Sequence, residues 1–461
     1  MCHGRFEFTD SRGKYAISFR HVLSALTIVS SHLFSAAAVC RSADWERAAT
    51  NVEHSRRFDS RQMAPTTEVG RAVDVDPAAW SVFHPHGLMP VDPAARRTWW
   101  SPFGKLDFHR AHDHGSPLWV SRVPGEFEQQ EALVLAAGGL AEEYPAILSS
   151  IITAAQRRIK LVGLVANSQK RKAVLQMLRR TGLPSSALIL IETPHDTIWV
   201  RDYGPVFVQT SGTQRVAMDA EYVCPDRAWD NEAPAVIAPL FHCTVVRLPM
   251  VLEGGNFLSN GQGICLTTTK TLGQNAEAVV SRTFGECFGS NQTVFLEPLS
   301  REPTGHVDMF ALFTAPNVVV IGAYQPNVDP ENAEILDRNA LRLAGLPTTH
   351  GPLQVVRIPM PDNRDGLWRT YLNVVFANGA LLVPVYPDAN PAVERTALET
   401  FRRLLPAWSL ASINVSEMIG AGGALHCIVA NVPRAPPPNR TALSPQSDSR
   451  ASSLGTIHLS D

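Results

Sequence analysis

The chain has 461 residues, of which 41 are Lys or Arg and 43 are Asp or Glu, and its formal net charge is -2. Hydrophobic residues make up 45% and charged residues 18%, so the chain can bury a large core and is not disordered as a whole. No charge excess indicates a nucleic acid or an anionic membrane surface as a partner, and no phosphate-loop, dinucleotide or zinc-spacing motif is present.

The 7 cysteines are scattered and odd in number, so a disulfide scaffold is not expected and at least one thiol stays unpaired. Cys224 and Cys243 could pair in an exported protein. The alternative is that both are small buried residues.

The two ends of the chain differ from its middle. Residues 1–43 have a basic start, an apolar run from Val22 to Val39 and small residues after it, which is typical of a signal peptide. We therefore expect export to the periplasm or beyond, or a cytoplasmic protein if the start codon is wrongly assigned. The apolar run is too short and too rich in Ser to predict stable membrane insertion.

Two further segments flank the expected catalytic domain at 118–433. Residues 44–117 are rich in Arg, Pro, His and Asp and are expected to form an irregular extension, in which Trp99 and Trp100 indicate partial packing onto the domain. Residues 434–461 are rich in Pro and Ser and are expected to be a disordered tail.

The middle of the chain alternates strand and helix patterns, which predicts an α/β fold. The first elements expected are a strand at 131–137, a helix at 144–158, a strand at 159–165, a helix that Ser168 caps and Gly182 ends, and a strand at 188–191. Later strands are expected at Val245–Leu248, Val318–Ile321, Leu381–Val385 and Cys427–Val429.

Polar clusters occur beside these strands at regular intervals. They centre on five residues, with 51, 53, 67 and 54 residues between them: Asp202, Glu253, His306, Asn373 and Cys427. This spacing indicates that each structural unit delivers one loop to a shared place.

Cys427 follows a turn that contains Gly420, Gly422 and Gly423, and it is expected to open an apolar strand. A thiol at the mouth of a strand can attack a substrate once a nearby cation favours its thiolate form. The alternative is a buried structural cysteine. His426 would point to the opposite face of the strand, so we expect it to be structural rather than the catalytic base.

His306 and Asp308 are two residues apart and would share one face of an extended segment. Such a pair can transfer protons and hold a cation. The alternative is a pair of metal ligands, but the sequence offers no matching third and fourth ligands.

The remaining clusters have polar groups beside an aromatic ring or glycines. Asp202 lies close to Trp199, and a carboxylate beside an aromatic face suits a planar cation, although the same stretch could be an ordinary turn with an Arg–Asp ion pair. Glu253 precedes two glycines, which indicates either a close approach at a polar centre or a structural turn. Asn373 is expected in mid-strand, where its amide needs partners.

Taken together, six stretches resemble the agmatine deiminase and Porphyromonas-type peptidylarginine deiminase family of the guanidino-group-modifying superfamily. They span about 124–433, in the family's order: PGEFEQQEALVL, HDTIWVRDYGPVFV, LEGGNFLSNGQGICLTTT, TGHVDMF, RTYLNVVFANGALLVPVY and GAGGALHCIVANVP. The resemblance implies a pentein-like α/β fold, a five-bladed propeller of ββαβ units around a central active site.

The resemblance also implies roles for residues at matching positions. Cys427 would be the nucleophile, His306 the general acid and base, and Asp202 and Asp308 the carboxylates that hold a guanidinium. Trp199, Glu253 and Asn373 would support substrate binding.

The implied activity is hydrolytic deimination through a covalent cysteine intermediate, without a metal or organic cofactor. Agmatine, converted to N-carbamoylputrescine, is the expected substrate, and peptidyl or free arginine is the alternative. An amidinotransferase or an inactive guanidino-binding protein is less expected. The stretches AEYVCPDRAWDNEAPAV and IVANVP depart from the family pattern, which leaves the substrate beyond the guanidinium open. Nothing in the sequence indicates the oligomeric state.

Overall fold

The computed structural model describes residues 120–435, apart from 212–213 and 225, and three short strands at 8–10, 13–15 and 105–107. Apart from residues 8–10 and 13–15, the expected signal peptide lies outside the described residues, as do Trp99, Trp100 and nearly all of the expected tail. The chain divides into one unit at Met1–Thr66 and another at Thr67–Asp461. In the first, β1 (Phe8–Asp10) and β2 (Gly13–Tyr15) pair in antiparallel fashion.

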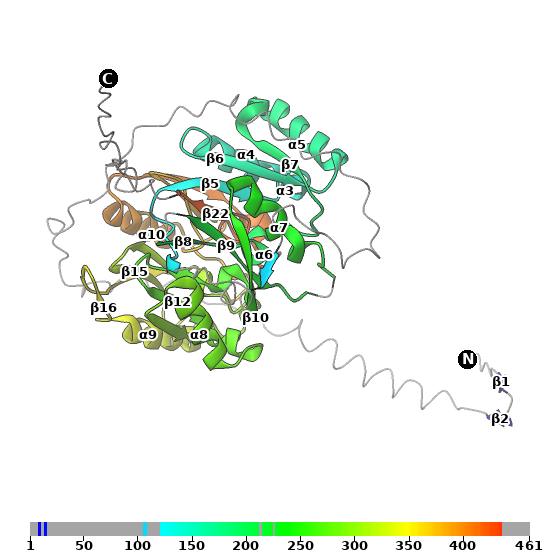
Figure 1. Cartoon of the computed structure of the whole chain (residues 1–461). Coiled ribbons are helices and arrows are strands. Elements are labelled where there is room, and N and C mark those ends of the chain that lie inside the picture. Colours follow the sequence, from blue (N-terminus) through cyan, green and yellow to red (C-terminus); the bar gives the residue numbers. More distant parts are fainter. Residues whose placement is uncertain are drawn as a thin grey trace, which may run out of the picture. The chain divides into compact units, whose positions relative to one another are not determined.

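Five sheets of the second unit repeat one plan (Figure 1). Two strands pair in antiparallel fashion, a helix follows, and a last strand joins the second one in parallel, so each sheet is a ββαβ unit. The simplest example has β11 (Leu258–Ser259), β12 (Ile264–Thr268), α8 (Glu277–Phe288) and β13 (Gln292–Leu296). The five-bladed fold expected from the sequence is therefore confirmed.

Two further sheets follow the same plan closely. One consists of β14 (Ala311–Ala315), β15 (Val318–Ala323), α9 (Pro330–Leu343) and β18 (Gln354–Pro359). The other consists of β19 (Val375–Phe376), β20 (Ala380–Val385), α10 (Pro391–Leu404) and β21 (Ser409–Asn414). Between α9 and β18, a small hairpin joins β16 (Pro347–Thr348) to β17 (Gly351–Pro352).

One blade carries extra strands at its edges. Its common part is β8 (Val206–Thr210), β9 (Arg215–Glu221), α7 (Ala233–Ile237) and β10 (Thr244–Val251). The edge strands are β4 (Val120–Arg122) beside β8 and β3 (Lys105–Asp107) beside β10. Thus three residues of the stretch 44–117, which was expected to be irregular, form an edge strand of this blade.

The last blade joins the two ends of the described domain. Its first strand, β22 (Ala430–Pro433), pairs in antiparallel fashion with β5 (Gln130–Leu135). The other elements are α3 (Ala137–Glu143), α4 (Pro145–Ala155), β6 (Lys160–Val165), α5 (Ser168–Thr181) and β7 (Ile189–Glu192). This pairing closes the ring, because the last described strand completes the sheet that β5 began.

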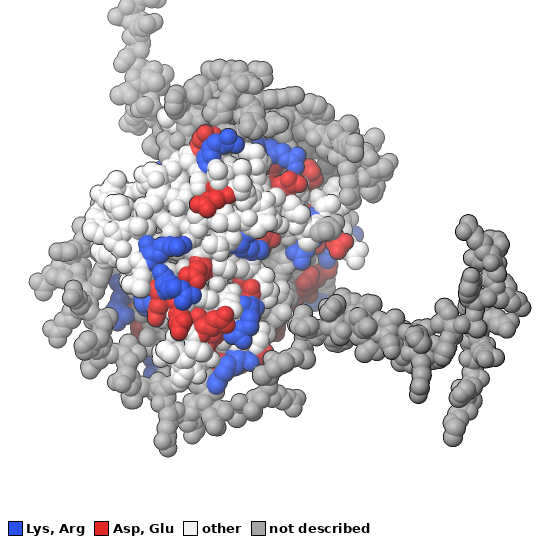
Figure 2. Space-filling view, turned by 90° about the horizontal axis from the view of Figure 1, so that it is seen from below, with Lys and Arg blue, Asp and Glu red and all other residues white. Residues whose placement is uncertain are grey.

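The core lies between the helices and the strands of each blade. In α10, for example, Ala397, Thr400, Phe401 and Leu404 are buried and the other side of the helix is polar, which is the amphipathic pattern of a helix on a sheet. On the face drawn in Figure 2, positive and negative side chains are interspersed, in keeping with the balanced composition. Among the described residues, no helix has the length and apolar character needed to cross a membrane.

Several local expectations are wrong. Asn167, not Ser168, caps α5, because its extended backbone lets its side chain accept two N–H groups, while Gly182 ends the helix at a φ of 72° as expected. Cys427 does not open a strand, because it lies in a turn and β22 begins at Ala430.

Asn373, His306 and Asp308 also lie outside the strands that the sequence predicted for them. Asn373 is in the loop before β19, not in mid-strand. His306 is extended, but Asp308 belongs to the 3-10 turn η9 (Val307–Met309), so the two do not share a strand face. The apolar residues around these positions resemble strands in sequence, but side chains rather than a neighbouring strand satisfy their backbone N–H groups. Asn256, for instance, accepts the N–H of Val307.

Candidate active site

The five blades place one polar loop each at the same position in the repeat. In every blade, the loop immediately before the first strand carries the residues that the sequence singled out. These pairs of residue and strand are Asp202 and β8, Glu253 and β11, His306 with Asp308 and β14, Asn373 and β19, and Cys427 and β22. The even spacing in sequence is therefore a consequence of the repeated ββαβ unit.

Gly255 shows how closely three of these side chains lie. Its N–H donates to Oδ1 of Asp202 at 3.2 Å, and Nδ1 of His306 lies 3.6 Å from the same oxygen. A Cβ atom added to Gly255 would lie 2.7 Å from both of those side-chain atoms and 3.2 Å from Oδ2 of Asp308. Only glycine leaves room for the imidazole and both carboxylates at this point.

Cys427 lies against the same cluster. Its Sγ is 3.9 Å from Oδ2 of Asp308 and 3.5 Å from Oδ1 of Asn373. A Cβ atom on Gly423 would lie 3.1 Å from Cβ of Cys427 and 2.5 Å from a ring carbon of Trp199, so the indole is also beside the thiol. The structure thus brings together the thiol, the imidazole, the two carboxylates and the indole that were singled out in the sequence.

Glu253 completes the set through His306. Its Oε2 lies 2.8 Å from Nε2 of His306 and accepts a hydrogen bond from Nζ of Lys270 at 2.6 Å. Burial raises the pKa of Glu253, but His306 and Lys270 outweigh it and lower the value to about 2. Glu253 is therefore a fixed negative charge that orients the imidazole.

The charges around the thiol set the protonation states of the free site. Burial lowers the pKa of His306, but Asp202, Glu253 and Asp308 outweigh it and raise the value to about 9. Burial raises the pKa of Asp202 to about 6. Burial, with the negative charges of Asp308 and Asp202, raises the pKa of Cys427 well above its usual range. Near pH 7 the site holds an imidazolium and a neutral thiol, and a bound cation would favour the thiolate.

The two oxygens of Asp308 have different surroundings. Oδ2 accepts a hydrogen bond from Nδ1 of His426 at 2.7 Å. Oδ1 is buried and has no hydrogen-bond partner among the described residues. Because a buried carboxylate oxygen needs a donor, this atom is suited to the N–H group of a substrate.

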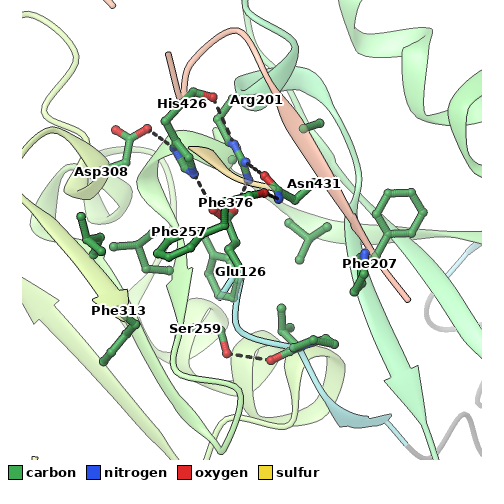
Figure 3. A pocket seen from close by; sticks show the side chains of 18 of the residues that line it. Glu126, Arg201, Phe207, Phe257, Ser259, Asp308, Phe313, Phe376, His426 and Asn431 are labelled. Carbon is green, nitrogen blue, oxygen red and sulfur yellow. Dashed lines mark hydrogen bonds and ion pairs between the residues drawn. The ribbon is translucent and has the colours of Figure 1, made fainter. Parts of the chain in front are cut away.

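A cavity lies beside Asp308 (Figure 3). Its walls include the rings of Phe257, Phe313 and Phe376, and its polar side includes Glu126, Arg201 and His426. Asp308 and His426 belong to its lining, but Cys427, His306 and Asp202 do not. The cavity therefore adjoins the cluster around Cys427 without containing the thiol.

Some residues of this region were not recognised in the sequence. Arg201 pairs with Glu126 at 2.7 Å rather than with its neighbour Asp202. Glu126 lies in a stretch that carried the family resemblance, but no local pattern marks it as part of the site. His426 was expected to be structural, and it does not contact the thiol in the manner of a base.

The segment that departs from the family pattern supports the loop before α6 (Val200–Tyr203). The buried carboxylate of Asp230 accepts the N–H groups of Asp196 and Thr197, and the Thr197 hydroxyl. Asp230 is therefore already engaged and does not offer a free charge to a substrate. Arg227 donates to the hydroxyl of Tyr222 at 3.0 Å.

Cys224 and Cys243 are free thiols in the structure. Within the described ranges, no group of three or more His, Cys, Asp and Glu side chains has an arrangement that could hold a metal ion.

The family model for the Porphyromonas-type peptidyl-arginine deiminases matches residues 122–433. A protein named "Putative agmatine deiminase" from Streptomyces coelicolor is 29% identical over 272 residues, which cover 53% of this chain and 78% of that protein. The solved agmatine deiminase of Enterococcus faecalis has a TM-score of 0.59 at 23% identity, over 68% of this chain and 96% of its own. A solved arginine deiminase of Porphyromonas gingivalis, titled as putative, has a TM-score of 0.58 at 24% identity, over 68% of this chain and 98% of its own. These two structures share the fold, and the match to the family model over most of the described domain shows that the chain belongs to the Porphyromonas-type peptidyl-arginine deiminase family of hydrolases that act on guanidino groups.

Proposed function

We propose that this protein deiminates a small guanidino substrate, most suitably agmatine, to N-carbamoylputrescine and ammonia through a covalent intermediate on Cys427. One observation carries the proposal. The Cys427 thiol lies 3.9 Å from the carboxylate of Asp308, whose other oxygen is buried without a partner. A planar cation with several N–H donors would satisfy that oxygen and place its central carbon near the sulfur.

The guanidinium would lie between Asp202 and Asp308. Its positive charge would offset the two carboxylates that disfavour the thiolate, so the Cys427 proton would leave to solvent when the substrate binds. Trp199, beside the thiol, would stack on the planar cation. Binding of the substrate would therefore also activate the nucleophile.

The first chemical step forms the bond between sulfur and the guanidinium carbon. The electron pair of a C–N π bond moves to nitrogen and gives a neutral tetrahedral adduct. His306, which is protonated near pH 7, then transfers its proton to one amino nitrogen. The C–N bond breaks, ammonia leaves, and a cationic thiouronium intermediate remains on Cys427.

The second step uses the same imidazole as a base. Neutral His306 takes a proton from water while the oxygen attacks the carbon of the intermediate. Collapse of this adduct breaks the C–S bond, the hydroxyl proton leaves to solvent, and the ureido product departs. Glu253 supports both steps because it holds Nε2 and leaves Nδ1 facing the reacting groups.

Agmatine is preferred here because the relative from Streptomyces coelicolor carries that name and the sequence motifs resemble that branch. Peptidyl or free arginine is the second candidate, because Arg227 lies in the segment that departs from the family pattern and its guanidinium could bind a substrate carboxylate. The chain would act on either substrate with the same guanidinium chemistry.

Product identification tests the proposal. The protein is incubated with agmatine, arginine and a short peptide that ends in arginine. Ammonia release is measured, and mass spectrometry detects replacement of NH by O in the product. We expect turnover of agmatine by the wild type, none by Cys427→Ala, and no effect of a chelator. The absence of ammonia release from every guanidino compound would refute the proposal.

We also propose that residues 1–43 direct export, on the basis of their signal-peptide pattern. Fusion of this segment to a reporter that functions only outside the cytoplasm tests the idea. A reporter that stays inactive and unprocessed would contradict it.

A further inference from the structure

Four charged side chains, of Arg201, Glu126, His426 and Asp308, form a line that ends at the cluster around Cys427 (Figure 3). Nη1 of Arg201 pairs with Oε1 of Glu126 at 2.7 Å, and Oε2 of Glu126 lies 2.9 Å from Nε2 of His426. Nδ1 of His426 lies 2.7 Å from Oδ2 of Asp308. The signs alternate along the line, and Arg201 is further fixed by a hydrogen bond of 2.8 Å to Asn431.

The position of His426 fixes its charge. A carboxylate accepts hydrogen bonds only, so the ring must donate from both nitrogens, which requires the doubly protonated imidazolium. Burial and Arg201 lower the pKa of His426, but Glu126 and Asp308 outweigh them and raise it. Because His426 is only 3% exposed, solvent screens this arrangement poorly.

We infer that His426 is a positioning residue for substrate binding: it anchors Oδ2 of Asp308 and thereby fixes the orientation of the carboxylate that would hold the guanidinium. This inference rests on the proposed function. Glu126 holds His426 from the other side, and Arg201 holds Glu126. The orientation of the Asp308 carboxylate is thus determined by groups other than Asp202, His306 and Cys427.

The geometry distinguishes this role from general support of the fold. Without its anchor, the Asp308 carboxylate could rotate, and Cys427, which donates to Oδ2 at 3.9 Å, would be left as the donor to that oxygen. The line connects the loops before β5, β8, β14 and β22, which are far apart in sequence. A structural role alone predicts lower stability, whereas a positioning role predicts weaker recognition of the planar cation.

Two substitutions at position 426 distinguish the contribution of Nδ1 from that of Nε2. In His426→Asn, the side-chain amide can donate from about the position of Nδ1 and so keep the bond to Asp308. In His426→Gln, the amide lies near the position of Nε2, and the donor to Asp308 is lost. His350→Gln is the control, because His350 is exposed and its bonds are to Thr349 and Gln262.

A pair of alkylating probes reports on recognition without turnover. 2-Chloroacetamidine carries a planar cation that resembles half of the substrate, and 2-chloroacetamide is its neutral counterpart of similar size. Both alkylate a cysteine, with loss of chloride as the sulfur bonds to carbon. The ratio of the two rates at Cys427, measured by intact mass, is the selectivity for the cation.

We expect the wild type and His350→Gln to prefer the amidine strongly. His426→Gln should lower the ratio about tenfold and raise KM for agmatine, because a charge-assisted hydrogen bond orients the carboxylate. His426→Asn should keep most of the ratio. Glu126→Gln, which preserves the shape of the side chain, should lower it severalfold and provides the test if His426→Gln does not fold.

The outcomes separate this inference from the proposed function. A wild type that shows no preference for the amidine would overturn both. A wild-type preference that persists in His426→Gln and Glu126→Gln would overturn the positioning role alone. The positioning role would also be overturned if His426→Asn and His426→Gln lowered the ratio of the two alkylation rates equally and in proportion to a loss of thermal stability.

Discussion

The Oδ1 atom of Asn373 lies 3.5 Å from Sγ of Cys427 and accepts the backbone N–H of His426 at 2.8 Å. One fully buried amide therefore fixes the turn that carries the nucleophile and contacts the nucleophile itself. The contact with the backbone explains why Cys427 lies in a turn and not in a strand.

Asn373→Ala should lower both stability and activity. Loss of the buried acceptor leaves backbone N–H groups of the turn without full hydrogen bonding, which costs about 1–3 kcal/mol. Urea unfolding measures this cost, and ammonia release measures activity. Asn373→Asp keeps an acceptor oxygen but adds a negative charge beside the thiol, so we expect smaller destabilisation with little activity. Full activity in Asn373→Ala would contradict this role.

The pH dependence should reflect Asp202 and His306. The negative charge of Asp202 binds the cation above its pKa of about 6 and is lost as the pH falls through that value. The proton that His306 donates is present below its pKa of about 9 and is lost as the pH rises through that value. We expect a bell-shaped profile of kcat/KM with limbs near these two values.

Glu253→Gln tests the assignment of the alkaline limb. Removal of the carboxylate charge at 2.8 Å from His306 lowers the pKa of the imidazole, so the alkaline limb should move to lower pH. An alkaline limb that stays in place would mean that a group other than His306 determines it.

Gly255→Ala should impair catalysis although it removes no chemical group. The new methyl would lie 2.7 Å from side-chain atoms of both Asp202 and His306, which must then move apart. A displacement of this kind can reduce kcat/KM about 100-fold. Gly273→Ala is the matched control, because its Cβ would meet nothing within 4 Å. Equal activities of the two variants would show that the cluster tolerates the displacement.

The effect of Arg227→Ala on kcat/KM distinguishes agmatine from peptidyl arginine as the substrate. If agmatine is the substrate, Arg227→Ala should change its kcat/KM little, since the side chain would contact no carboxylate. The comparison substrate is a peptide that ends in arginine. If kcat/KM were about tenfold higher for the peptide than for agmatine, and Arg227→Ala weakened this preference, the peptide would be the substrate instead of agmatine. The guanidinium chemistry would be unchanged.

The sequence by itself determined the repeated architecture and the position of the chemistry. Apolar runs, separated by Gly, Pro and Asn, place β6, β15 and β20 within a few residues of their observed bounds. The intervals between Asp202 and Cys427 follow from the blade length, because each repeat puts one loop at the same end of its first strand. Such patterns are local, and they therefore appear in the sequence alone.

Only the tertiary structure decided how the loops fold and which residues support them. The turn at Cys427 depends on Asn373, and the anchoring of Asp308 depends on His426 and, through it, on Glu126. No periodic pattern marks these contacts, since they join residues that are far apart in the sequence. They form only when β22 pairs with β5 and closes the ring, which brings Glu126 and His426 together across 300 residues of sequence.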